Sequence, residues 1–195
     1  ARNNSPTAII WDMPDSQDGY LGRPTEEIEF ARNAVGACQF GSQHRRATLE
    51  MSRQFFPPVT TAWDGVKQVV LIGDHLANDA AAMTAVRRWL MAGGRMWIML
   101  DLVHQDTVER LLGDGCPYRE VDRVGLTTLQ IQAPKGSGRP VDAKASNYEQ
   151  PVQFVRTLVT GVEVTHTLNE WPASFEQVYG RGKVIFTTLG MRAWL

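Results

Sequence analysis

The chain has 195 residues, of which 43% are hydrophobic and 21% charged; this is typical of one globular domain and excludes wholesale disorder. Its 20 basic and 21 acidic residues give a net charge of −1, so no basic excess is present to follow a phosphate backbone, and we expect no nucleic-acid partner. No apolar run approaches the roughly 18–20 residues that cross a bilayer, and no signal peptide is evident.

The N-terminal part predicts one strand and one helix. The apolar residues 8–11 predict a strand that ends at Asp12, and the turn-forming residues 14–19 predict a long loop after it. Thr25, followed by acidic residues, is typical of a helix N-cap. We expect that helix to run to about Val35.

Residues 67–101 give the clearest pattern in the chain. The β-branched run at residues 69–72 predicts a strand that is buried on both faces. Asp79 then predicts the cap of a helix, which Gly93-Gly94 closes, and residues 96–100 predict a second buried strand. Strand, helix and strand within about 35 residues form a βαβ unit, so we expect the two strands to be parallel.

The C-terminal part predicts a different style of structure. Residues 106–112 predict a short helix, residues 126–132 a strand and residues 134–151 a loop-like stretch. Residues 175–179 and 183–188 flank Gly180-Arg181-Gly182, a pattern that predicts a β-hairpin with a glycine-bearing turn.

Acidic and histidine side chains follow three of the predicted strands. They are Asp12, Asp74 with His75, and Asp101 with His104 three residues further on. In an open parallel sheet ligands bind outside the carboxyl ends of the strands, so these groups are candidates for a divalent metal site or an acid–base pair. The alternative is that each Asp serves as a turn or capping residue and that both histidines are partly exposed loop residues.

Other catalytic motifs are absent from the sequence. No GxxxxGK[ST] or GxGxxG phosphate loop occurs, and we predict no cofactor. Cys38 and Cys116 belong to no CxxC or Cys/His pattern, so a structural zinc site is not expected. Cys38 fits a small buried hydrophobe better than a nucleophile, because the residues before it are charged and helix-like, whereas a nucleophile elbow follows an apolar strand.

Residues 68–101, QVVLIGDHLANDAAAMTAVRRWLMAGGRMWIMLD, resemble the central unit of class I glutamine amidotransferase-like domains. The segment EWPASFEQVYGRGKVIFTTLGMRAW is similar to the closing hairpin of uncharacterised bacterial domains of this kind, which occur within larger, often membrane-anchored proteins of unknown function. The resemblance implies a flavodoxin-like or amidotransferase-like α/β domain over residues 1–195, with a doubly wound, mostly parallel sheet and a C-terminal β-hairpin.

The catalytic residues of amidotransferases do not carry over. The family has a cysteine in a G-x-C-x-G elbow and a later H-x-E pair, whereas Cys116 lies in a Gly-Cys-Pro turn and His166 is followed by Thr167 and Leu168. Cys38 lies upstream of the βαβ unit, which is the wrong order for that nucleophile. No catalytic residue is therefore assigned.

Three functions remain open. The first is a non-catalytic amidotransferase-like domain that serves as an interaction or ligand-sensing module, with an unknown protein or small molecule as partner. The second is a metal-assisted hydrolase, or another small-molecule enzyme, that uses the five residues at the strand ends. The third is a flavin or nucleotide binder. We expect the chain to be a fragment of a larger protein, with the membrane involved only through the parent's other parts, on its periplasmic or cytoplasmic face.

Overall fold

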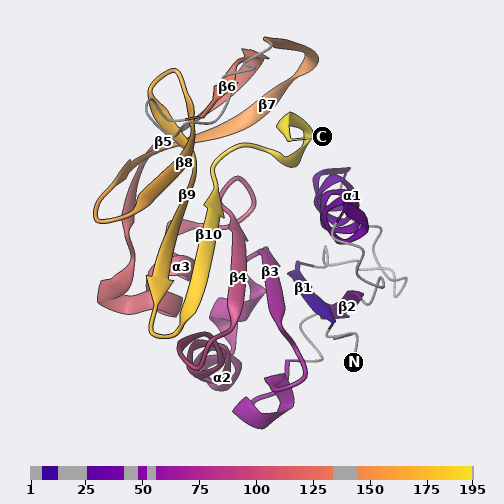
Figure 1. Ribbon diagram of the computed structural model, residues 1–195, viewed down its shortest axis with the longest axis vertical. Coiled ribbons are helices and arrows are strands. Elements are labelled where there is room, and N and C mark those ends of the chain that lie inside the picture. Colours follow the sequence, from indigo (N-terminus) through magenta and orange to yellow (C-terminus); the bar gives the residue numbers. More distant parts are fainter. Residues whose placement is uncertain (1–5, 13–25, 42–47, 52–55, 134–144, 195) are drawn as a thin grey trace.

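The computed structural model describes residues 6–12, 26–41, 48–51, 56–133 and 145–194. Within these ranges, ten strands form an α/β fold around an eight-stranded mixed sheet, in the order β2-β1-β3-β4-β10-β9-β8-β6 (Figure 1). The strands of this sheet are β1 Thr7–Trp11, β2 Thr48–Met51, β3 Gln68–Ile72, β4 Arg95–Met99, β6 Ile131–Gln132, β8 Glu163–Leu168, β9 Trp171–Tyr179 and β10 Gly182–Thr187. The neighbours among β2, β1, β3, β4 and β10 pair in parallel. The neighbours among β10, β9, β8 and β6 pair antiparallel.

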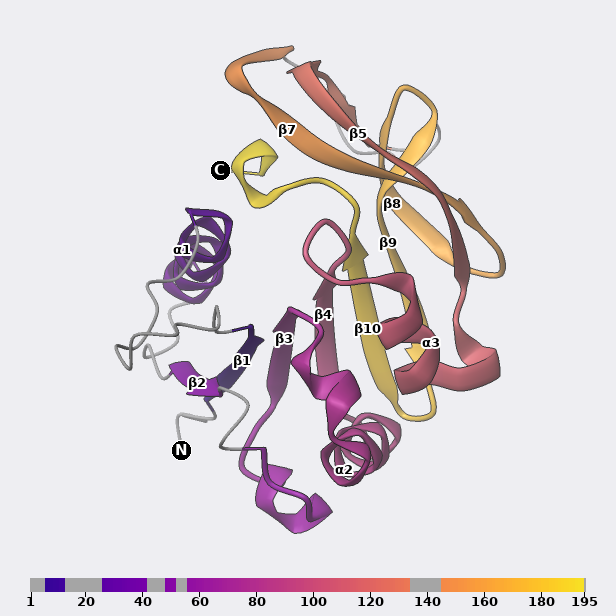
Figure 2. The ribbon, with the colours of Figure 1, turned by 180° about the vertical axis from the view of Figure 1, so that it is seen from behind.

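Helices lie on both faces of the parallel half of the sheet. Helix α1, Glu26–Gly41, packs on one face, and α2, Ala80–Met91, and α3, Gln105–Leu112, pack on the other. Seen from behind, α3 lies in front of the sheet beside β4 and β10 (Figure 2). No helix among the described residues is long and apolar enough to span a bilayer.

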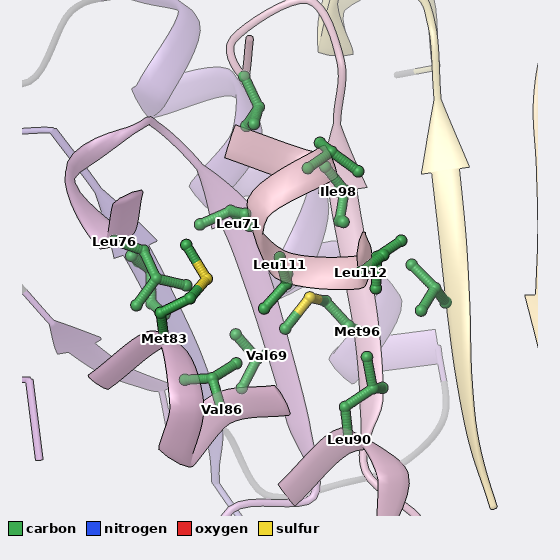
Figure 3. Packing of buried hydrophobic residues seen from close by; sticks show 14 of the residues in the cluster. Val69, Leu71, Leu76, Met83, Val86, Leu90, Met96, Ile98, Leu111 and Leu112 are labelled. Carbon is green, nitrogen blue, oxygen red and sulfur yellow. The ribbon is translucent and has the colours of Figure 1, made fainter. Parts of the chain in front are cut away.

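The main core fills the space between the sheet and helices α2 and α3. Alternate residues of β3 and β4 point into it, and α2 meets them through residues three or four positions apart (Figure 3). The labelled side chains are those of Val69, Leu71, Leu76, Met83, Val86, Leu90, Met96, Ile98, Leu111 and Leu112. Strand β3 is buried on both faces from Val69 to Ile72, which agrees with its continuous apolar run.

The predicted βαβ unit is confirmed. Strands β3 and β4 are parallel neighbours, with Val69 opposite Met96. The Asp79 side chain accepts a hydrogen bond from the backbone N–H of Ala82 and so caps α2, as expected. Gly93, just beyond the end of α2, has φ 124°, a conformation that disfavours any residue with a Cβ.

Two predicted boundaries are wrong. Helix α1 continues through Gly36 to Gly41 instead of stopping near Val35, and a glycine inside a helix costs about 1 kcal/mol, which tertiary packing can offset. Its predicted N-cap, Thr25, lies outside the described residues. Part of the predicted loop at 134–151 is instead strand β7, Ser146–Val159.

Strand β7 pairs with β5, Tyr118–Leu129, in a separate two-stranded sheet. The ladder is interrupted after Glu120 and after Leu126, and these irregularities shift the alternation along β5. Only the end of this strand was expected from the sequence. The ribbon packs through Phe154 and Val152 against Leu189, and this contact fastens it beside the main sheet.

The C-terminal hairpin is confirmed, and it has a second role. Strands β9 and β10 pair antiparallel around Gly180, which has φ 62°. Strand β10 also pairs in parallel with β4, so it extends the parallel sheet, a connection that no local pattern predicts.

Candidate functional site

The candidate site lies at the edge of the sheet where the parallel strands have their carboxyl ends. Asp12 follows β1, Asp74 and His75 follow β3, and Asp101 and His104 follow β4. Strand β3 lies between β1 and β4, so the topology brings the ends of three separate segments to one rim. We call this rim, formed by Asp12, Asp74, His75, His104 and Thr107, the carboxyl edge.

Asp12 links the end of β1 to the end of β3. Its Oδ2 atom accepts a hydrogen bond from the backbone N–H of Asp74 at 2.8 Å, and its Oδ1 atom accepts one from the N–H of His75 at 2.9 Å. The imidazole Nε2 of His75 lies 4.0 Å from the same Oδ1. Both carboxylate oxygens of Asp12 are thus engaged with the neighbouring loop.

Gly73 makes this link possible. A Cβ atom built on Gly73 would lie 2.3 Å from Oδ1 of Asp12 and 2.8 Å from its backbone nitrogen, which is closer than non-bonded atoms can approach. Only glycine therefore lets the Asp12 carboxylate lie against the end of β3.

Asp74 links β3 to the start of α3. Its Oδ1 atom accepts hydrogen bonds from the backbone N–H of His104 at 2.9 Å and from the hydroxyl of Thr107 at 2.5 Å. Its Oδ2 atom lies 3.8 Å from Nε2 of His104, whose side chain is 76% exposed. His104 is the N-cap residue of α3, but its own side chain makes no capping hydrogen bond. Asp74, which belongs to another segment, provides the hydrogen-bond acceptor at that end of the helix instead.

The loop after β4 is also held by Arg123, which comes from β5. The guanidinium of Arg123 donates to the carbonyl oxygens of Asp101 at 3.0 Å and Val103 at 3.1 Å, and it forms an ion pair with Glu120. The side chain of Asp101 lies near Gly190, where a Cβ would come within 3.6 Å of its Oδ2.

Four of the five predicted site residues therefore form two close pairs, Asp12 with His75 and Asp74 with His104, and Asp101 belongs to neither. Within the described ranges, no three acidic, histidine or cysteine side chains lie close enough together to hold one metal ion. Asp101 consequently does not complete a metal site with the other four. The capping and turn roles account for each contact that the structure gives Asp12 and Asp74.

Cys116 has the environment of a weak nucleophile. It is a half-buried free thiol, and its Sγ lies 3.6 Å from the carbonyl oxygen of Tyr118. Burial raises the pKa of the Cys116 thiol above its ordinary value, which disfavours the reactive thiolate. The side chain of Cys38 lies outside the described residues.

Sequence reasoning missed two residues that shape the carboxyl edge. Thr107 carried no signal, because His104-x-x-Thr107 is not a capping box and the hydroxyl of Thr107 meets Asp74, 33 residues away. Arg123 carried no signal, because the strand that holds it was not expected to begin until residue 126 and its partners come from the loop after β4.

Comparison with known proteins establishes similarity of fold. No family model matches the chain, and no curated protein matches it in sequence. A cytoplasmic protein from Salmonella typhimurium LT2 has a similar structure, with a TM-score of 0.65 and 14% identity over 93% of this chain and 86% of that one.

Two further similar structures are those of proteins from other bacteria. A protein from Bacteroides uniformis described as ThuA-like has a TM-score of 0.62 and 11% identity, with 97% of this chain and 84% of that chain covered. A β-galactosidase from Bacillus circulans has a TM-score of 0.62 and 10% identity; the match covers 97% of this chain and 29% of that enzyme. At these identities the likeness establishes an α/β fold and does not carry an activity over to this chain.

Proposed function

We propose that this chain is a non-catalytic amidotransferase-like domain that serves as an interaction or ligand-sensing module of a larger protein. The order of its parallel strands supports the flavodoxin-like part of this proposal. Numbered along the chain, β2, β1, β3, β4 and β10 correspond to the order 2-1-3-4-5, which is the flavodoxin-like order. In that order the topological switch point lies between β1 and β3, and this is where such folds bind their ligands.

One observation carries the non-catalytic part of the proposal: the switch point is bridged by the protein's own hydrogen bonds. Asp12, at the end of β1, reaches across to the backbone N–H groups of Asp74 and His75, at the end of β3. Backbone N–H groups at this position are the donors that would otherwise cradle an anionic ligand. Here both receive their acceptor from Asp12, and the absence of a side chain on Gly73 makes room for it.

The engaged carboxylates argue against the metal-assisted enzyme. A metal ligand or general base needs a lone pair directed at the ion or the substrate. Of the two lone pairs on each carboxylate oxygen, each oxygen of Asp12 gives one to a donor of the same chain and Oδ1 of Asp74 gives both, so fewer remain for an ion or a substrate. The fold likeness to 29% of a β-galactosidase chain supports the idea that such a domain works as one part of a larger protein.

Thermal unfolding with added ligands and a glutaminase assay test the proposal. A ligand at 100 times its dissociation constant raises stability by about 2.7 kcal/mol, so even a moderate binder is visible. We expect no ammonia release from glutamine and no increase in Tm with Zn²⁺, Mg²⁺ or Mn²⁺. A shift with glutamine without turnover would support ligand sensing, whereas a shift with FMN or a nucleotide would favour the flavin or nucleotide binder. Two results would contradict the proposal: a metal-dependent shift that disappears in Asp12→Asn and Asp74→Asn, or glutaminase activity that disappears in Cys38→Ser.

A further inference from the structure

Among the described residues, no helix covers one face of the antiparallel half of the sheet. On the side that α1 covers elsewhere, the strands from β4 to β8 present, besides the partly buried Trp97, six residues that we call the open face: Arg95, Lys183, Ile185, Glu176, Val178 and Glu163. In the view of Figure 1 no helix lies in front of β9 and β10. Val178 is 72% exposed and Ile185 38% exposed.

The exposure of Ile185 is unusual for its position. Strand β10 is parallel to β4, and parallel strands are normally covered on both faces. Ile185 pairs with Trp97, which is itself only partly buried, so an aromatic and an aliphatic side chain lie side by side at the surface. A contiguous apolar surface in such a position is typical of an interaction site.

The charges of the open face are sorted by sign across the strands. Arg95 and Lys183 occupy β4 and β10, whereas Glu176 and Glu163 occupy β9 and β8. Glu163 lies directly opposite Glu176 in the ladder, and like charges in this position repel. Lys183 forms an ion pair with Glu176, but within the described residues neither Arg95 nor Glu163 has an ion-pair partner.

From this pattern we infer that the open face binds a second copy of the same chain. The inference rests on the proposed role as an interaction module. Strands lie about 4.8 Å apart, so Arg95 on β4 and Glu163 three strands away on β8 are roughly 15 Å apart and cannot meet within one copy. A two-fold axis in the plane of the face, passing over Ile185 and Val178, carries each Arg95 onto the Glu163 of the other copy.

The same axis satisfies the other groups of the face. It places Ile185 against Ile185 of the second copy and Val178 against Val178 of the second copy. The exposed apolar side chains are thus buried at the centre of the interface. It also carries Lys183 towards Glu176 of the second copy. A two-fold interface requires this self-complementarity. If one residue of the first copy contacts a second residue of the other copy, the same contact occurs again with the two copies exchanged. Charge pairs at the rim would set the register of the two faces.

The size of the face sets the expected affinity. Four strands about 4.8 Å apart cover only a few hundred Å² on each copy, which is below the roughly 800 Å² per partner of a stable complex. We therefore expect a reversible dimer with a micromolar dissociation constant. Such a dimer would respond to the local concentration of the chain.

Sedimentation velocity over about 5–500 µM tests the inference, with charge-reversal variants to locate the interface. We expect Arg95→Glu and Glu163→Arg each to weaken the dimer about tenfold. The double variant should restore the dissociation constant to within about threefold of the original, because it exchanges the two charges of every intermolecular pair. Arg119→Glu, an exposed site on β5, is the control and should leave the dimer unchanged.

Far-ultraviolet circular dichroism and urea unfolding would confirm that the variants fold. A monomer at all concentrations would overturn the inference, and so would a dimer that ignores the reversals or a double variant that is not rescued. These outcomes are separate from those of the glutaminase and ligand experiments. A monomer without enzymatic activity would contradict the dimer and leave the proposed non-catalytic role in place.

Discussion

The carboxyl edge and the open face use polar groups in opposite ways. At the carboxyl edge, Asp12 and Asp74 accept hydrogen bonds from three backbone N–H groups and one hydroxyl, so their carboxylates are taken up by the chain itself. On the open face, Arg95 and Glu163 stand on exposed strand positions without an ion pair from the described chain.

This difference separates stability from function. Groups that hold the ends of three segments together should matter to folding, and groups that face solvent should matter to association. The carboxyl ends of the parallel strands, where open α/β sheets bind their ligands, here hold the chain's own segments together, whereas the charged and apolar side chains of the open face remain accessible. Substitutions in the two regions should therefore have different consequences.

The largest effect is expected at Gly73. In Gly73→Ala the new Cβ would collide with the side chain and the backbone nitrogen of Asp12, so the link between β1 and β3 must break or the strands must shift. We expect a loss of about 3 kcal/mol in the free energy of unfolding, measured in urea. Gly65→Ala is the matched control, because a Cβ there meets no atom within 4 Å and should change stability by less than about 0.5 kcal/mol. Equal effects at the two glycines would contradict the close approach.

Removal of the Asp74 carboxylate should cost about 2 kcal/mol. Asp74→Ala leaves the N–H of His104 and the hydroxyl of Thr107 without their acceptor, and it removes a negative charge from the start of α3. Urea unfolding of Asp114→Asn, an exposed acid, gives the baseline for loss of one negative charge. If Asp74→Ala were no less stable than Asp114→Asn, the carboxyl edge would not be structural.

Two buried threonines allow a hydroxyl that makes a hydrogen bond to be compared with one that makes none, by the same Thr→Val substitution. The hydroxyl of Thr188 donates to the carbonyl oxygen of Pro172 at 2.8 Å, whereas the hydroxyl of Thr157 is buried without a hydrogen-bond partner. Thr188→Val should lower stability by about 1 kcal/mol, and Thr157→Val should leave it unchanged or raise it by a similar amount. Thermal unfolding of both variants measures the difference, and the same sign in both would contradict the assignment of these hydroxyls.

The smallest effect is expected at the exposed ion pair of the β5–β7 ribbon. The hydrogen bond from Arg156 holds the pKa of Asp122 below its ordinary value of 3.8. A lowered pKa in the folded state means that the stabilisation is present above pH 4 and is lost as the pH falls through the folded-state value. The Tm difference between the wild type and Asp122→Asn should therefore be largest near neutral pH and shrink in acid. A difference that does not depend on pH would exclude the ion pair as its source.

Local patterns predicted the parts of the fold whose signals lie within one segment. The βαβ unit has a continuous apolar strand, a capping Asp79 and a closing Gly93, and each feature was readable in sequence. The β5–β7 ribbon was largely missed, because polar residues, Pro151 and two breaks in the ladder obscure the alternation.

The sequence indicated candidate residues at the strand ends, but the partners of these residues were not predictable from it. An Asp after a strand is equally compatible with a ligand site and with a cap, and the choice depends on which distant backbone N–H it meets. Asp12 meets residues 62 and 63 positions away, and Asp74 meets a residue 30 positions away. The open face was likewise hidden, because Ile185 reads as an ordinary core residue of a hairpin until the helices are placed.

Amide hydrogen exchange followed by NMR tests the central claim most directly, namely that the carboxylates of the carboxyl edge accept hydrogen bonds from the chain itself. In the wild type we expect the amides of Asp74, His75 and His104 to be protected. In Asp12→Ala the protection of the Asp74 and His75 amides should fall while that of His104 persists, and Asp74→Ala should give the reverse pattern. Fast exchange of all three amides in the wild type, or protection that neither variant changes, would contradict the account.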